Sequence, residues 1–179
     1  QDSFPKQPAF KINQRKPAVN TMKVAAIQMV SSAQVEANLR SAGRLLEAAA
    51  ADGAELAVLP EYFCLLGHRD TDKLQVQEAF GDGLIQQFLA DTARRLHIWI
   101  VGGTLPVSSD VPDSADAASR SRVLNASLVF SPGGQCVARY DKMHLFRFDN
   151  GRERYDESRA LLPGAQPVSA THAAWLGPE

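Results

Sequence analysis

Apolar residues recur at helical spacing in two segments of the chain. Between 34 and 51, and again between 83 and 97, they fall at three- and four-residue steps with polar residues opposite. Such spacing is typical of amphipathic helices that bury one face. We therefore predict helices over both segments. The positions expected to face the core are Val35, Leu39, Ala42, Leu45, Leu46 and Ala49, and then Leu84, Ile85, Phe88, Leu89, Ala93 and Leu96.

Shorter apolar runs predict strands between and after these helices. They cover 23–30, 56–59, 98–101, 123–130 and 136–140, and the Ser-Pro-Gly-Gly turn at 131–134 makes the last two a hairpin. The segment 106–118, rich in Ser, Asp and Pro, is expected to be an exposed loop. Strands alternating with amphipathic helices indicate an α/β layered sheet.

The first 21 residues differ from the rest. They hold three prolines and four basic residues against one acid, and they show no periodicity. Segments of this kind do not bury enough apolar surface to fold. We expect residues 1–21 to form a flexible tail and 22–179 to form the domain.

Composition narrows the classes of function. The chain has 179 residues, 45% of them hydrophobic, which fits one globular domain. Its 19 basic and 20 acidic residues are spread along the chain, so a small molecule is expected as the partner, and neither nucleic acid nor a membrane. No apolar run approaches the roughly 20 residues of a membrane helix. Two cysteines without a secretory h-region predict a reduced, cytoplasmic setting.

Two charged residues stand at the ends of predicted strands. Glu61 follows Val58-Leu59-Pro60 at a carboxyl end, where open α/β sheets place their ligand crevices, and this position suits a general base. Lys142 has apolar neighbours, where an ammonium needs a partner such as a carboxylate. In a dry cleft the pair would hold a positive charge where a tetrahedral oxyanion develops. The plain alternatives are a solvated loop glutamate and an exposed lysine on an edge strand.

The histidines and cysteines are weaker candidates for catalytic or metal-binding residues. His144 lies eight residues from Cys136, with no third group to orient it. The remaining histidines show no metal-ligand spacing, so no metal site is expected. Cys64 is expected to be a small packed residue. Asn125-Ala-Ser has the form of a glycosylation acceptor but lies in a predicted strand, and we interpret it as chance.

Four ordered segments together are similar to the nitrilase, or carbon-nitrogen hydrolase, superfamily. They are Val24-Ala-Ala-Ile-Gln-Met, Leu56-Ala-Val-Leu-Pro-Glu-Tyr-Phe, Val123-Leu-Asn-Ala-Ser-Leu-Val-Phe-Ser-Pro-Gly-Gly and Tyr140-Asp-Lys-Met-His-Leu-Phe. The Lys-x-His-Leu-Phe form resembles the omega-amidase and deaminated-glutathione amidase branch. The resemblance implies an α-β-β-α four-layer sandwich that hydrolyses a small amide without a metal or organic cofactor.

The resemblance also implies a Glu-Lys-Cys catalytic set. Glu61 matches the family's general base, and Lys142 matches its oxyanion-stabilising lysine. Glu157 falls where many members carry a second active-site glutamate, although by spacing alone a solvated loop acid is an equal alternative. The family's nucleophilic cysteine follows the next strand after the lysine.

That cysteine has no counterpart here. Cys64 and Cys136 both precede Lys142, and the chain reaches Glu179 without a Cys-Tyr-Asp-like turn. We expect the C-terminal part of the sandwich to be missing, through an expression boundary, a truncated gene or an altered reading frame. The chain alone is then expected to be inactive, and poorly soluble or oligomeric through an uncovered apolar face, while the complete protein is expected to be a homo-oligomer. The alternative is a non-catalytic binding or regulatory fragment that retains the fold.

Overall fold

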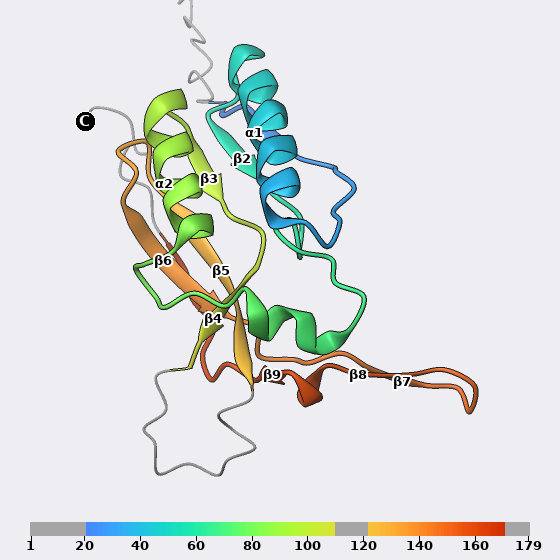
Figure 1. The fold of residues 1–179 in the computed structure, drawn as a ribbon. Coiled ribbons are helices and arrows are strands. Elements are labelled where there is room, and N and C mark those ends of the chain that lie inside the picture. The colour runs from blue at the N-terminus through green and yellow to red at the C-terminus, as the bar shows by residue number, and fades with distance from the viewer. Residues whose placement is uncertain (1–20, 110–121, 171–179) are drawn as a thin grey trace, which may run out of the picture.

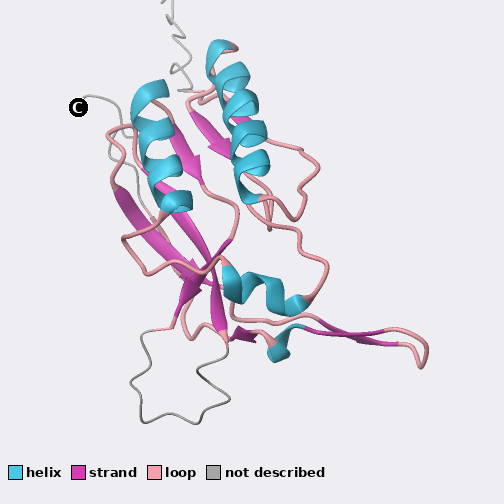
Figure 2. Cartoon of the chain, in the orientation of Figure 1, coloured by secondary structure: helices cyan, strands magenta, loops and turns pink. Residues whose placement is uncertain are grey.

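A computed structural model describes residues 21–109 and 122–170 of the chain (Figures 1 and 2). The predicted tail 1–21 therefore lies almost wholly outside the described residues. The helical elements are α1 (Val35–Ala51), η1 (Asp70–Gln75), α2 (Leu84–Leu96) and η2 (Glu157–Arg159). The strands are β1 (Val24–Ala26), β2 (Leu56–Val58), β3 (Trp99–Val101), β4 (Leu105–Ser108), β5 (Val123–Phe130), β6 (Cys136–Asp141), β7 (Arg147–Asp149), β8 (Arg154–Asp156) and β9 (Leu161–Leu162).

Seven of the strands form one sheet around β5. Strands β1, β2 and β3 are parallel, and β5 runs antiparallel to β3. Ala126 of β5 pairs with Leu105 of β4 on one side and with Asp141 of β6 on the other. Strand β9 pairs in parallel with the first two residues of β5. Strands β7 and β8 form a separate hairpin that projects from the body (Figure 1).

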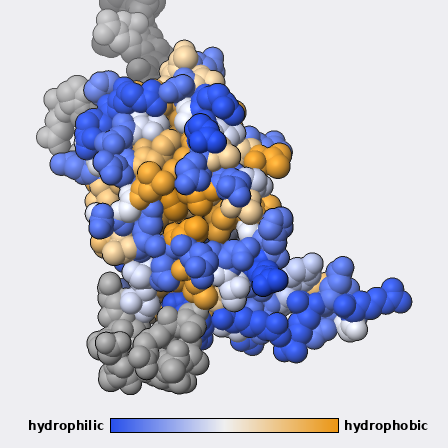
Figure 3. Space-filling model, in the orientation of Figure 1, coloured by the Kyte–Doolittle hydropathy of each residue, from blue (hydrophilic) through white to orange (hydrophobic). Residues whose placement is uncertain are grey.

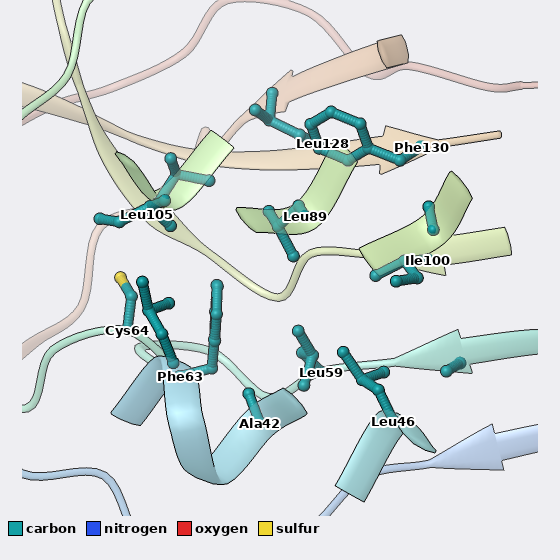
Figure 4. Close-up of a cluster of buried hydrophobic side chains, with 14 of the residues drawn as sticks. Ala42, Leu46, Leu59, Phe63, Cys64, Leu89, Ile100, Leu105, Leu128 and Phe130 are labelled. Atoms are coloured by element: carbon teal, nitrogen blue, oxygen red, sulfur yellow. The ribbon is translucent and has the colours of Figure 1, made fainter. Parts of the chain in front are cut away.

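Both long helices cover the same face of this sheet (Figure 1). Leu46 of α1 and Leu89 of α2 are fully buried, as are Ile100 and Leu128 from the strands beneath them (Figure 4). Between the helices, apolar side chains also gather at the surface (Figure 3). The predicted amphipathic helices are confirmed, because most of their apolar stripes pack into this core. Leu84, expected to face the core, is instead 57% exposed at the first residue of α2.

The opposite face of the sheet is apolar but open within the described part of the chain. Val24, Leu56 and Trp99 are paired in register, so their side chains share that face. Val24 is 54% exposed, and the other two are half-buried. The described residues therefore form one helix layer and one sheet layer, and the predicted α/β class is confirmed.

The prediction that the exposed loop begins at residue 106 is wrong. Leu105–Ser108 forms β4, and its first three residues are buried. Pro106 is tolerated because its carbonyl accepts from Glu78 N, on the side away from β5, so its missing N–H removes no bond of the β4–β5 pair. Residues 110–118 lie outside the described part. The first predicted strand is also shorter than expected, with β1 covering only Val24–Ala26.

Strands β3 and β4 are successive stretches along the same side of β5, interrupted at 102–104. The segment after β2 passes against this interruption. Tyr62 N donates to Thr104 Oγ1 at 2.9 Å, and Phe63 and Cys64 then enter the core (Figure 4). The break in the strand thus anchors the residues that surround Glu61.

Candidate active site

The sheet topology brings three charged residues to one edge. Strand β5 is antiparallel to both β3 and β6, so β6 points the same way as β2 and β3. Glu61 follows β2, and Lys142 follows β6. Strand β9 is parallel to β5, so its amino end, which η2 and Glu157 precede, lies at the same edge. Parallel carboxyl ends thus explain why residues 81 positions apart meet.

The ammonium of Lys142 lies between two carboxylates. Its Nζ is 3.0 Å from Glu61 Oε1 and 3.0 Å from Glu157 Oε2. The side chain of Glu157 is 13% exposed and that of Lys142 is 22% exposed, whereas Glu61 is 46% exposed. Glu157 therefore forms the enclosed side of the cluster, and Glu61 forms the side open to a ligand. Glu61 is therefore not simply a solvated loop glutamate, and Lys142 is not simply an exposed lysine on an edge strand, because the two side chains form an ion pair with each other.

Asn125 on β5 fixes both members of this pair. Its carbonyl accepts from Lys142 N at 3.0 Å, which extends the β5–β6 ladder by one residue. Its Nδ2 donates to Glu61 Oε1 at 2.9 Å. Asn125 is 2% exposed, and its glycosylation-like sequence lies within strand β5, as expected for that segment. Sequence reasoning missed its contact with Glu61, although a buried polar residue inside an apolar strand was the available signal.

Glu157 is held by three kinds of donor. Tyr62 Oη donates to Oε1 at 2.6 Å, Phe146 N donates to Oε2 at 2.7 Å, and Lys142 completes the set. Burial alone would raise the pKa of Glu157, but these hydrogen bonds outweigh it and lower the pKa below the usual 4.5. Burial would likewise lower the pKa of Lys142, and the hydrogen bonds to Glu157 and Glu61 raise it. Glu157 and Lys142 therefore stay charged at neutral pH.

The lowered pKa of Glu157 predicts a pH-dependent contribution to stability. A carboxyl group with a depressed folded-state pKa stabilises the fold above its unfolded value, here 4.5, and loses that effect as the pH falls through the folded value. Glu157→Gln is expected to lower the free energy of unfolding most near pH 7, and progressively less below about pH 4.5. Urea unfolding across this range measures the effect, with the exposed Glu153→Gln as the matched control. A Glu157→Gln deficit that is equal at all pH values would contradict the prediction.

Neither cysteine lies at the cluster. Cys64 is buried in the core, its Sγ donates to Thr104 O at 3.6 Å, and burial raises the pKa of its thiol to about 12. Cys136 begins β6, at the opposite end of that strand from Lys142. His144 is exposed. Among residues 21–109 and 122–170, no three His, Cys, Asp or Glu side chains are grouped to hold a metal, and no helix there is long and apolar enough to cross a membrane.

Comparison with known proteins places this chain in a class of hydrolases. The family described as carbon-nitrogen hydrolase matches residues 23–179, which is most of the chain. The chain therefore belongs to the carbon-nitrogen hydrolase family, within the nitrilase superfamily.

Several similar proteins are named as amidases. The chain is 32% identical to the deaminated glutathione amidase of Synechocystis over 154 residues, which cover 86% of this chain and 53% of that protein. It is 30% identical to omega-amidase NIT2 of Danio rerio over 147 residues, 82% of this chain and 49% of that protein. The chain thus spans about half the length of the curated relatives it matches.

Solved structures show the same fold. Nit3 of Saccharomyces cerevisiae, a member of branch 10 of the nitrilase superfamily, matches with a TM-score of 0.66 and 27% identity over 82% of this chain and 50% of that chain. The NitFhit protein of C. elegans matches with a TM-score of 0.64 and 23% identity over 83% of this chain and 35% of that chain. The expected nitrilase-type fold is confirmed.

Proposed function

We propose that the longest protein that the gene encodes, here called the complete gene product, hydrolyses a small amide. In this reaction Glu61 is the general base and Lys142 is the oxyanion-stabilising cation. The observation that carries this proposal is the position of Lys142 Nζ, 3.0 Å from both carboxylates at the carboxyl edge of the sheet. The names of the amidase relatives support an omega-amide of a dicarboxylic acid, or a deaminated peptide such as deaminated glutathione, as the substrate.

The geometry divides the chemical roles between the two carboxylates. Oε1 of Glu61 accepts from Lys142 and Asn125, while Oε2 accepts no hydrogen bond within the described part of the chain. Because Oε2 belongs to the more exposed carboxylate, it is the oxygen available to take a proton. Glu157 accepts from Tyr62, Phe146 and Lys142, and this occupied carboxylate suits a role in holding the ammonium.

The proposed reaction needs a thiol beside Glu61. As the thiol sulfur bonds to the amide carbon, Glu61 takes the thiol proton, and Lys142 stabilises the negative oxygen of the tetrahedral intermediate. Breaking the carbon-nitrogen bond releases ammonia, which takes a proton from Glu61, and leaves a thioester. Glu61 then takes a proton from water as the water oxygen attacks the thioester, and it returns that proton to the sulfur as the carbon–sulfur bond breaks and the acid and the thiol are released.

The 179 residues alone do not complete this mechanism. Their two thiols are Cys64, buried under the helices, and Cys136, at the other end of β6. We therefore propose that this chain by itself releases no ammonia. The expected association of the chain through its open sheet face, and of the complete protein as a homo-oligomer, also stays a prediction.

Ammonia release tests the proposal. The complete gene product is expected to release ammonia from alpha-ketoglutaramate or from deaminated glutathione, and the 179-residue chain is expected to stay at the background rate. Absence of ammonia release from both substrates by the complete gene product would contradict the proposed function. Substrate binding without ammonia release would instead favour a binding or regulatory role.

A further inference from the structure

Tyr62, directly after Glu61, has an unusual backbone conformation. Its φ is 58°, in the left-handed region that non-glycine residues rarely adopt. Within the described part of the chain the other such residue is His97, with a φ of 53°, and its conformation is explained by its place at the end of α2. Tyr62 ends no helix and is held by its N–H bond to Thr104 Oγ1. A conformation that is unfavourable by about 1 kcal/mol or more, maintained beside a candidate general base, indicates a task for the side chain.

The hydroxyl of Tyr62 lies between two charged groups. Lys73 Nζ is 3.0 Å from Tyr62 Oη, and Tyr62 Oη is 2.6 Å from Glu157 Oε1. An ammonium group only donates hydrogen bonds and an ionised carboxylate only accepts them. The hydroxyl must therefore accept from Lys73 and donate its single proton to Glu157. The carboxylate of Glu157 requires the hydroxyl to donate, and Lys73 occupies the accepting side of the same oxygen.

Lys73 is built into the fold at this position. It lies in η1, whose first turn is closed by the carboxylate of Asp72, which accepts hydrogen bonds from His68 N and Arg69 N. Helix η1 lies against η2, the short helix that begins at Glu157. The ammonium of Lys73 also stands 4.3 Å from the centre of the Tyr62 ring, at cation–π distance.

The surroundings of Lys73 distinguish it from a surface lysine. It is half-buried, and no carboxylate of the described residues forms an ion pair with it. Burial lowers the pKa of Lys73, which the nearby charges of Glu157, Asp70 and Glu61 partly offset. Its hydrogen-bond partner in the structure is the neutral Tyr62 hydroxyl.

We propose that Lys73 and Tyr62 are a positioning pair for the catalytic cluster: Lys73 orients the Tyr62 hydroxyl, and the hydroxyl holds Glu157 in the place where it fixes Lys142. The pair extends the cluster into one chain of hydrogen bonds, from Lys73 through Tyr62, Glu157 and Lys142 to Glu61. The kinetic effects expected from this pair rest on the proposed function, but the positions of the Lys73, Tyr62 and Glu157 side chains do not.

A double-mutant cycle on the complete gene product tests the order of action. Tyr62→Phe and Lys73→Met are each expected to lower kcat about 10- to 100-fold, the effect of one hydrogen bond to a charged group, with KM nearly unchanged. Because Lys73 acts through Tyr62, the double variant is expected to be no slower than Tyr62→Phe alone. Lys73→Arg, which keeps a donor, is expected to retain most of the activity. Tyr155→Phe, on the projecting β7–β8 hairpin, and Lys23→Met, before β1, both change exposed side chains and are the matched controls.

Two kinetic results would overturn the proposal. Multiplicative losses in the double variant would show that the two residues act independently. A rise in KM for amides that carry a carboxylate, without a change for neutral amides, would instead make Lys73 a substrate-binding group.

A crystal structure of Lys73→Met separates failure of this inference from failure of the proposed function. The Tyr62 hydroxyl is expected to leave Glu157 Oε1 and lose the 2.6 Å contact seen with Lys73 present. If the contact persists unchanged in the variant, the positioning role of Lys73 is wrong, whether or not the protein releases ammonia. If the contact is lost and no amide is hydrolysed, the positioning pair stands and the proposed reaction fails.

Discussion

Glu61→Gln is expected to lower ammonia release by the complete gene product by about 10³-fold or more, with little change in KM. Glutamine has nearly the shape of glutamate, and its amide oxygen can still accept from Lys142 and Asn125. It takes no proton from a thiol or from water, and the proposed mechanism uses Glu61 as the base for both. General bases contribute about 10² to 10⁴ in rate, and this one serves two steps.

The matched control for this prediction is Glu153→Gln. Glu153 lies exposed in the turn between β7 and β8, so the same change of charge is made away from the cluster. Steady-state ammonia release by purified proteins with equal unfolding midpoints measures the effect. If Glu61→Gln keeps a tenth or more of the activity, Glu61 is not the base, and the cluster at the sheet edge has another task.

Much of the fold follows from local apolar patterns. Helices α1 and α2 and strands β2, β3 and β5 were predictable because each buries apolar side chains along one stripe or run. Strand β6 has no fully buried residue, and the turn at 131–134 that pairs it with β5 made it predictable. Strand β4 was not, since Pro106 and the serines after it are typical of loops and only pairing with β5 makes them a strand. Strands β7, β8 and β9 are too short for an alternating pattern to be recognised in the sequence. Each forms only because it pairs with a partner distant in sequence or across a turn.

The candidate site divides in the same way. Glu61 and Lys142 were predictable because a charge at the end of an apolar strand is visible in one segment. Asn125 contacts Glu61 only through the pairing of β2 with β3 and of β3 with β5. Lys73 reaches Tyr62 only through the path of a loop. Such contacts join segments whose relative placement no local pattern specifies. The catalytic roles of Glu61, Lys142 and Glu157 stay predictions.

Gly103 supports the backbone on which Glu61 depends. It lies in the interruption between β3 and β4, with a φ of +52° that favours glycine. A Cβ added there would fall on the backbone carbonyl of Pro60, the residue before Glu61. Backbone atoms do not move aside as the end of a flexible side chain does, so the added methyl group must displace the Glu61 segment or the strand break itself.

Gly103→Ala is therefore expected to lower the free energy of unfolding by about 3 kcal/mol, the sum of a left-handed alanine and an overpacked contact. It should also lower ammonia release about 10²-fold, because a shift of about 1 Å in a catalytic group has an effect of this size. Gly151→Ala is the matched control, since Gly151 has a φ of +80° with no atom within 4 Å of the added Cβ. That variant bears only the conformational cost, about 1 to 2 kcal/mol, and should keep full activity. Urea unfolding and ammonia release of the two variants measure the difference, and equal losses in both would show that the approach to Pro60 does not position Glu61.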